Sequence, residues 1–83
     1  IRVNAICPGF IGTRWFKDKM DEEQYQRMEA SVAAATPLNV ASGPDDFADS
    51  ALFFLTDASR HVTGETLLVD AGTHLGYAPL TAR

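Results

Sequence analysis

Residues 1–13 read IRVNAICPGFIGT, a short apolar run that stops abruptly at a Pro-Gly pair. Apolar side chains recur at alternate positions within residues 1–6, and this pattern predicts a β-strand. Pro8 is expected to end the strand, because proline has no backbone N–H to donate to a sheet. Gly9 then permits backbone angles that other residues resist. The chain is therefore expected to present bare backbone directly after a strand.

Two helices are predicted after this turn. Asp21 and Gln24 have the spacing of a capping box, and the helix that they begin is expected to run until Thr36-Pro37 ends it. The second helix covers about residues 44–56, because Pro44 suits a first turn and the acidic pair after it suits the positive end of the helix dipole. A short helical turn is expected near residues 14–20.

Both predicted helices have an apolar side. On the first, Tyr25, Met28 and Val32 recur at spacings of three and four, which favours a buried helix face over substrate contacts. On the second, the apolar residues form a wider face. Its members are Phe47, Ala48, Ala51, Leu52 and Leu55, with Phe53 and Phe54 extending it.

Residues 65–70 are the second predicted strand. Leu67-Leu68-Val69 is a continuous apolar run, which is typical of a strand covered on both faces. Two strands joined by a long helical crossover are most simply parallel neighbours in one sheet. Because two strands are too few to stand alone, we expect further strands from a longer chain or from partner chains.

The composition is that of one ordinary globular domain, with 83 residues, 46% of them hydrophobic and 22% charged. The single cysteine, Cys7, excludes an internal disulfide and favours a reducing, cytoplasmic location. Cys7 itself is expected to be a buried, unreactive thiol. His61 and His74 have no cluster of ligating neighbours, so no metal site is predicted. A net charge of -4 with scattered basic residues disfavours nucleic acid, and no apolar run is long enough to predict a membrane span.

The opening stretch, together with GPDDFADSALFFLTDASRHVTGETLLVDAG at residues 43–72, resembles the C-terminal part of the short-chain dehydrogenase/reductase family. The Pro-Gly strand end followed by a threonine, the helix opened by Pro-Asp-Asp, and the Val-Thr-Gly before the last strand have the family's order and spacing. The resemblance implies an α/β fold, a C-terminal fragment of a Rossmann-type doubly wound parallel sheet. Residues 1–83 would then be part of one domain, with a tail at residues 73–83.

The resemblance implies that the segment contacts NAD or NADP. The cofactor-facing loop would be residues 7–13, with Pro8, Gly9 and Ile11 along the nicotinamide ring and Thr13 bonding its carboxamide or the pyrophosphate. Residues 14–36 would form a substrate lid. The side chains expected to face the pocket from this lid are Trp15, Phe16 and Met20, and their bulk would favour an apolar substrate.

The family's catalytic residues have no counterpart in this sequence. Tyr25 is followed four positions on by Glu29, and Tyr77 by Thr81, so neither tyrosine supplies the family's Tyr-x-x-x-Lys pair. In the family the tyrosine is the general acid/base and the lysine lowers its pKa. We therefore assign no catalytic residue and do not expect the 83 residues to be active alone.

Two functions stay open at this point. The first is part of an oxidoreductase that transfers hydride between nicotinamide and a carbonyl or alcohol substrate. The second is a truncated, non-enzymatic module that mediates assembly through the last strand and the helix before it, surfaces that commonly join subunits in dimers or tetramers of the family. A Tyr-x-x-x-Lys pair upstream would favour the first function, and a genuine start near Ile1 the second. Tyr77 and Leu80 could reach a neighbouring subunit's site.

Two smaller expectations concern the strands. Asn4, in the middle of the first strand, is expected to make a structural hydrogen bond near the floor of the active site. The second strand ends in Asp70-Ala71-Gly72, where the family often has two glycines. The alanine implies a less extreme backbone at that position.

Overall fold

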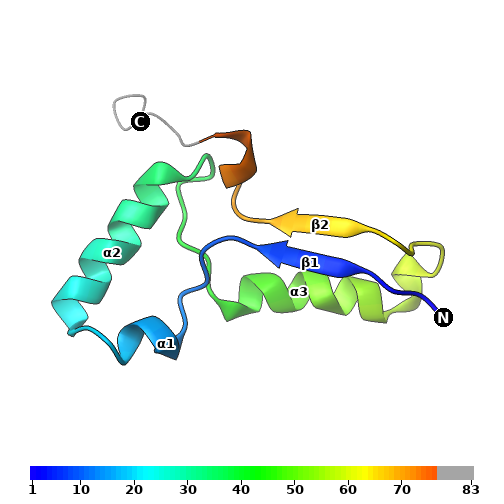
Figure 1. Ribbon diagram of the computed structural model, residues 1–83, viewed down its shortest axis with the longest axis horizontal. Helices are drawn as coiled ribbons and strands as arrows, with labels where there is room; N and C mark the ends of the chain where they lie inside the picture. The colour runs from blue at the N-terminus through cyan, green and yellow to red at the C-terminus, as the bar shows by residue number, and fades with distance from the viewer. Residues whose placement is uncertain (77–83) are drawn as a thin grey trace.

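Strands β1 (Ala5–Pro8) and β2 (Thr66–Val69) form a parallel, two-stranded sheet (Figure 1). The computed structural model describes residues 1–76; the predicted roles of Tyr77 and Leu80 lie outside this range. Ala5 pairs with Thr66 and Pro8 with Val69, so the two strands end side by side. The prediction of parallel strands joined through helices is confirmed.

Strand β1 begins four residues later than predicted and includes Pro8. The backbone N–H groups of Ala5 and Gly9 donate to the β2 side, to the carbonyls of Glu65 (2.9 Å) and Val69 (3.2 Å). Because N–H groups alternate sides along a strand, the nitrogen of Pro8 faces away from β2. Strand β1 ends at Pro8, as predicted. The missing donor of Pro8 breaks no bond to β2, however, so it is not what ends the pairing of these two strands.

Three helices connect the strands: α1 (Arg14–Lys17), α2 (Glu22–Ala35) and α3 (Pro44–Leu55). Helix α2 begins with the predicted capping box. The Gln24 N–H donates to Asp21 Oδ1 at 2.7 Å, and the Asp21 N–H donates to Gln24 Oε1 at 3.0 Å. Both bonds satisfy N–H groups that would otherwise lack partners at the start of the helix.

Two short 3-10 turns complete the described elements, η1 (Asp57–Ser59) and η2 (Thr73–Leu75). The second one lies in the tail, for which no structure was predicted.

Helix α3 also begins with a capping bond like those of α2. The Gly43 N–H donates to Asp46 Oδ2 at 2.8 Å. None of the helices within residues 1–76 is long and apolar enough to cross a membrane.

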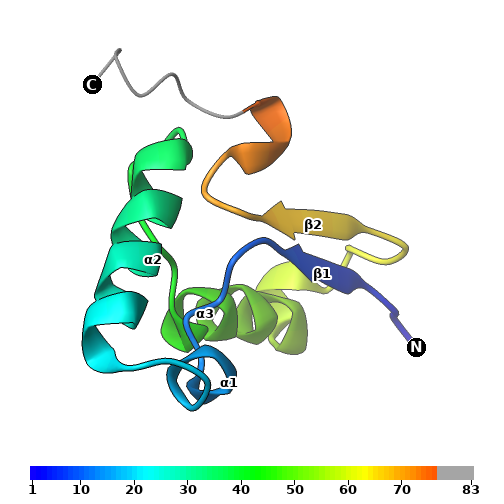
Figure 2. The ribbon, with the colours of Figure 1, turned by 60° about the vertical axis from the view of Figure 1, so that its left-hand side comes forward.

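The elements form a thin slab, with extents of 45 × 32 × 15 Å. Helix α3 lies along β1 on one face of the sheet, and α2 stands beyond the carboxyl ends of the strands (Figures 1 and 2). Among residues 1–76, the sheet therefore has one helical layer. The space between α2 and the strand ends is where the loops after β1, α2 and β2 converge.

The apolar residues of β2 and α3 are only partly covered within this thin slab. The side chains of Leu67 and Leu68 are 36% and 48% exposed, so β2 is not covered on both faces by the described residues. On α3, Leu52 and Leu55 belong to the predicted apolar face, and they are 59% and 80% exposed. The more buried side of α3 is a narrower row of residues. These are Phe47, Ser50, Ala51 and Phe54.

Polar side chains fasten the amino end of β1. Asn4 Nδ2 donates to the Val62 carbonyl at 3.0 Å, and Asn4 Oδ1 accepts from the Glu65 N–H at 2.9 Å. Arg2 donates to Val62 (3.0 Å) and to Phe54 (2.9 Å), whose carbonyl belongs to the last turn of α3. The structural role predicted for Asn4 is confirmed. Its predicted place is wrong, because these bonds lie at the end of the strand opposite to the converging loops.

Candidate functional site

The carboxyl ends of the two strands meet at Gly9 and Asp70. A Cβ atom built on Gly9 would lie 2.8 Å from the Cβ of Asp70, which is closer than two such carbon atoms approach in proteins. Glycine at this position therefore allows the two strand ends to touch. The sequence suggested that Gly9 makes room for a cofactor ring. The close approach of the neighbouring strand already requires a residue without a side chain at this position.

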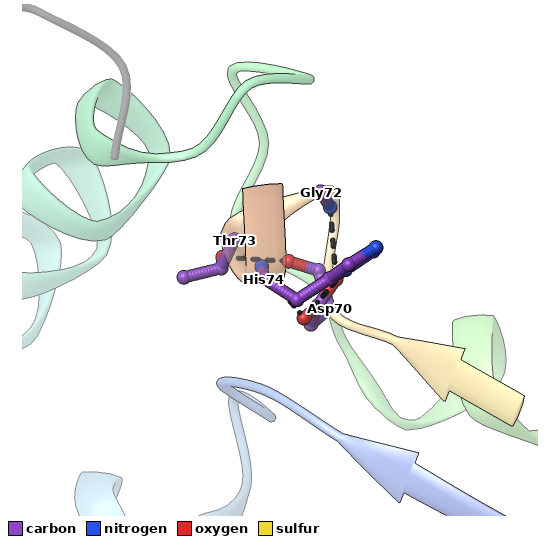
Figure 3. Close-up of polar contacts among 4 residues, drawn as sticks. All are labelled: Asp70, Gly72, Thr73 and His74. Atoms are coloured by element: carbon purple, nitrogen blue, oxygen red, sulfur yellow. Dashed lines mark hydrogen bonds and ion pairs between the residues drawn. The ribbon is translucent and has the colours of Figure 1, made fainter. Parts of the chain in front are cut away.

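Asp70 organises the turn that follows β2, and Figure 3 shows its partners gathered around the carboxylate. Its oxygens accept from the N–H groups of Gly72 and His74, both at 3.0 Å, and lie 2.9 Å from His74 Nδ1 at the nearest. The Thr73 hydroxyl donates to the Asp70 carbonyl at 2.7 Å. These bonds, the one from the His74 side chain foremost, lower the pKa of Asp70 below its ordinary value of 3.8. The carboxylate is therefore ionised at neutral pH and held in place.

The residue after Asp70 overturns the expectation of an ordinary backbone. Ala71 has φ +57°, in the left-handed region, which costs a residue other than glycine about 1–2 kcal/mol. The conformation is held from outside, because the Ala71 carbonyl accepts from the Leu38 N–H at 3.1 Å. Gly72 has φ +90°, and a Cβ there would lie 3.0 Å from the Pro37 ring. The turn after β2 is thus locked against the loop after α2.

A cavity of about 330 Å³ opens where these loops converge. Its walls are the second half of α2, the loop that follows α2, the exit from β1 and the Asp70 turn. The lining residues are Gly9, Phe10, Ser31, Val32, Ala35, Thr36, Val40, Ser42, Asp70, Ala71 and Thr73. Its volume falls within the range of about 300–1,000 Å³ typical of small-molecule sites. Of the residues predicted as site residues, Gly9 alone lines it, and Val32 lines it although it was predicted to be part of a buried helix face.

The loop after Gly9 is held against α2 at Gly12. The Gly12 N–H donates to the Ser42 carbonyl at 2.9 Å. A Cβ on Gly12 would lie 2.5 Å from the hydroxyl of Tyr25, so a larger residue there would displace the buried tyrosine side chain. Tyr25 is buried, as predicted, and its burial, followed by the nearby Glu29 carboxylate, raises the pKa of its hydroxyl. The phenol is therefore neutral and serves packing.

The other predicted cofactor residues flank this point. Pro8 is exposed at the end of β1, and Ile11 and Thr13 are half-buried in the loop. Thr13 is the N-cap residue of α1, but its hydroxyl makes no capping hydrogen bond. The Thr13 hydroxyl is thus uncommitted among residues 1–76, which suits a group that bonds a ligand.

The predicted lid side chains form an aromatic cluster at α1. The rings of Phe16 and Trp15 meet edge to face with centroids 4.8 Å apart, and Phe16 lies 5.2 Å from Phe10. Lys19 Nζ lies 3.6 Å from the centroid of the Trp15 ring, and Trp15 is 60% exposed. Neither these lid rings nor Met20 line the cavity. Phe10 belongs to both the cluster and the cavity wall and so connects them.

The polar part of the cavity was missed by the sequence analysis. Asp70 could have been found, because ligands in parallel α/β sheets bind outside the carboxyl ends of the strands, and Asp70 directly follows β2. The same rule had pointed to Gly9. By contrast, no local pattern singles out Ser31 or Ser42, which are brought to the cavity by the tertiary placement of α2 and its exit loop.

Comparison with known proteins identifies the class. The chain superimposes on a solved small-chain dehydrogenase in complex with NADPH with a TM-score of 0.77 and 30% identity, over 92% of this chain and 33% of that one. The fold is thus part of a Rossmann-type parallel sheet. Residues 1–74 match a family model described as enoyl-(acyl carrier protein) reductase. The chain belongs to the short-chain dehydrogenase/reductase family.

Curated relatives are dehydrogenases and reductases. The chain is 42% identical over 73 residues to an L-rhamnose 1-dehydrogenase (NAD(P)(+)) of Azotobacter vinelandii, covering 87% of this chain and 27% of that protein. It is 38% identical over 76 residues to a 7alpha-hydroxysteroid dehydrogenase of Clostridium sardiniense, covering 92% of this chain and 28% of that protein. The chain therefore spans little more than a quarter of the length of these relatives.

Proposed function

We propose that this chain is the cofactor-facing and lid-bearing part of an NAD(P)-dependent oxidoreductase that acts on a carbonyl or alcohol group of a small molecule. Family membership supports the reaction class. The name of the rhamnose dehydrogenase includes NAD(P)(+), and similar solved structures hold NADH or NADPH. The observation that carries the proposal is the uncommitted Thr13 hydroxyl on a loop that leaves the carboxyl end of a parallel strand.

The described residues fit a nicotinamide dinucleotide in their donor chemistry. Pro8, Gly9 and Ile11 would form the wall along the ring, and Thr13 would donate to the carboxamide or accept from it. The bond from Gly12 to Ser42 holds the backbone next to Thr13 in place before the ligand arrives. The cofactor, when bound, supplies the hydride chemistry. No residue of this chain is given the role of catalytic acid or base.

The rest of the segment would exclude water and hold the substrate. Helices α1 and α2, within residues 14–36, would form the lid, and the side chains of Trp15, Phe16 and Met20 would shield the site from solvent. Residues 1–83 would be one part of a Rossmann-type domain with cytoplasmic location. Subunits would join in a dimer or tetramer through β2 and α3, where Leu52 and Leu68 are exposed in this chain.

Thr13→Ala in the full-length enzyme tests the proposed cofactor contact. We expect the affinity for NADH or NADPH to fall by about 1–2 kcal/mol, roughly a five- to thirty-fold rise in Kd, because one hydrogen bond to the cofactor is lost. Titration of cofactor fluorescence measures it. Thr13→Ser keeps the hydroxyl and should bind nearly as well as the wild type. Unchanged affinity in the alanine variant would rule out the assigned contact.

A non-enzymatic assembly module of the same fold is the alternative, because the exposed leucines of α3 and β2 would serve it equally well. The two functions differ in what precedes this segment. Sequencing the full transcript decides between them. A Tyr-x-x-x-Lys pair a few tens of residues before Ile1 supports the oxidoreductase, and its absence from the translated protein supports the module.

A further inference from the structure

We infer that the cavity between α2 and the Asp70 turn holds the non-reacting part of a neutral, polyhydroxylated substrate of the sugar or polyol type. The inference rests on the proposed function, because it places the substrate at the same carboxyl edge of the sheet as the cofactor. It differs from the sequence-based expectation of an apolar substrate, which was drawn from Trp15, Phe16 and Met20. Those side chains do not line this cavity.

Uncommitted hydroxyl groups are the first argument. Ser31 projects from α2 and Ser42 from the loop before α3, and neither side chain makes a hydrogen bond with another residue among 1–76. The Thr73 hydroxyl donates its hydrogen bond to the Asp70 carbonyl, and its lone pairs can accept a hydrogen bond from a ligand. Thr36 differs, because its hydroxyl is already bonded to Ala33 and Val40. A wholly apolar ligand would leave the serine hydroxyls without partners, which disfavours it.

Charge is the second argument. Among the lining residues that the structure describes, Asp70 is the only one with a charged side chain, and its negative charge is held by His74 and two backbone N–H groups. An anionic ligand would approach this carboxylate and find no cationic side chain in the lining. Ligand hydroxyls, in contrast, can donate to the carboxylate oxygens. The cavity therefore selects against carboxylates and phosphates and accepts neutral donors.

The apolar wall is the third argument. Phe10, Val32 and Val40 lie among the lining residues together with two alanines. A sugar ring has hydroxyls around its edge and C–H groups on its faces, so it can use both kinds of wall at once. A few placed polar groups in a mostly apolar lining are the usual way in which a small-molecule site fixes orientation. The mixture here matches that type of molecule.

The experiment uses the full-length enzyme with saturating NAD(P)+ and three kinds of probe. The probes are a panel of aldohexoses and pentitols, the corresponding uronic and aldonic acids, and cyclohexanol as an apolar alcohol. Calorimetry measures binding and initial rates measure kcat/KM. We expect the neutral polyols to bind best and their acids at least about ten-fold more weakly, the effect of about 1.4 kcal/mol.

Matched variants locate the binding. Ser31→Ala and Ser42→Ala should each raise KM for the preferred polyol about three- to ten-fold, the effect of one lost hydrogen bond, and leave KM for cyclohexanol unchanged. Ser50→Ala is the control, because Ser50 lies on α3 and does not line the cavity. These substitutions remove no hydrogen bond within the fold, so the variants should remain folded, which circular dichroism verifies.

Several outcomes would overturn the inference. They are binding of no polyol in the panel, preference for an acid or for cyclohexanol, and equal kinetics of the serine variants and the wild type. The proposed function is tested apart from this by the cofactor titration with Thr13→Ala. An enzyme that binds NAD(P)H through Thr13 and prefers cyclohexanol would refute the inference about the cavity alone, whereas an enzyme that binds no cofactor would refute the proposed function.

Discussion

Ala71 and Gly72 share a positive φ but differ in what a side chain would meet. For Ala71→Gly we expect the free energy of unfolding to rise by about 0.5–1 kcal/mol, because relief of a strain of about 1–2 kcal/mol exceeds the entropic cost of a glycine, about 0.4–1 kcal/mol. Gly72→Ala should lower the stability, since its Cβ would also press on Pro37. Urea denaturation of the full-length protein measures both. Changes of the same sign in the two variants would contradict this account.

The ionised Asp70 gives the stability a defined pH dependence. Its pKa is lower in the folded protein than its ordinary value of 3.8. The carboxylate therefore stabilises the fold above that value, and its contribution is lost as the pH falls through the lower, folded-state pKa. Asp70→Asn should be less stable than the wild type at neutral pH, and the difference should narrow below about pH 5. Thermal unfolding across this range measures it. Asp49→Asn, at an exposed site on α3, is the control, and a gap that stays constant with pH would refute the prediction.

At the scale of elements, the cap of α2 controls one wall of the cavity. Asp21→Ala removes the side chain that accepts from the Gln24 N–H, and we expect a loss of about 1 kcal/mol in stability, concentrated in α2. Hydrogen exchange of the α2 amides in the full-length protein should speed up more than exchange in α3. Glu23→Ala, in the same first turn but outside the cap, is the matched control. Equal exchange in both variants would mean that tertiary packing alone holds the helix.

The elements also separate what the sequence could predict from what it could not. The start of α2 was predicted to the residue, because a capping box is a bond between groups three positions apart. The exposure of Leu55 and Leu68 was not, because the depth of burial depends on which layers cover an element. The cavity lies between these cases. Gly9 was found from its place after a strand, whereas Ser31 and Ser42 line the same cavity with no local pattern to reveal them.

At the scale of the whole molecule, a slab 15 Å thick leaves many of its large apolar side chains exposed. We propose that the exposed face of β2 is covered in the full-length protein or its oligomer. Leu68→Asp should then abolish folding or assembly, because it places an unpaired charge in a covered position. Leu68→Val, which keeps the apolar character, should be tolerated. Size-exclusion chromatography of the expressed proteins distinguishes them. A normally assembled aspartate variant would mean that this face stays in contact with water.

The orientation of Pro8 has a consequence for any strand that adds to the open edge of β1. The backbone nitrogens of Ile6 and Pro8 face that edge, because those of Ala5 and Gly9 face β2. An incoming strand can accept a hydrogen bond from the Ile6 N–H and none from Pro8, so the last hydrogen bond along this edge is missing. Beyond that point the two chains are free to diverge, and a fork between parallel strands is where sheets of this kind admit ligands. Pro8 thus limits how far a strand added at this edge can be hydrogen-bonded to β1, and so where a crevice between the two strands begins.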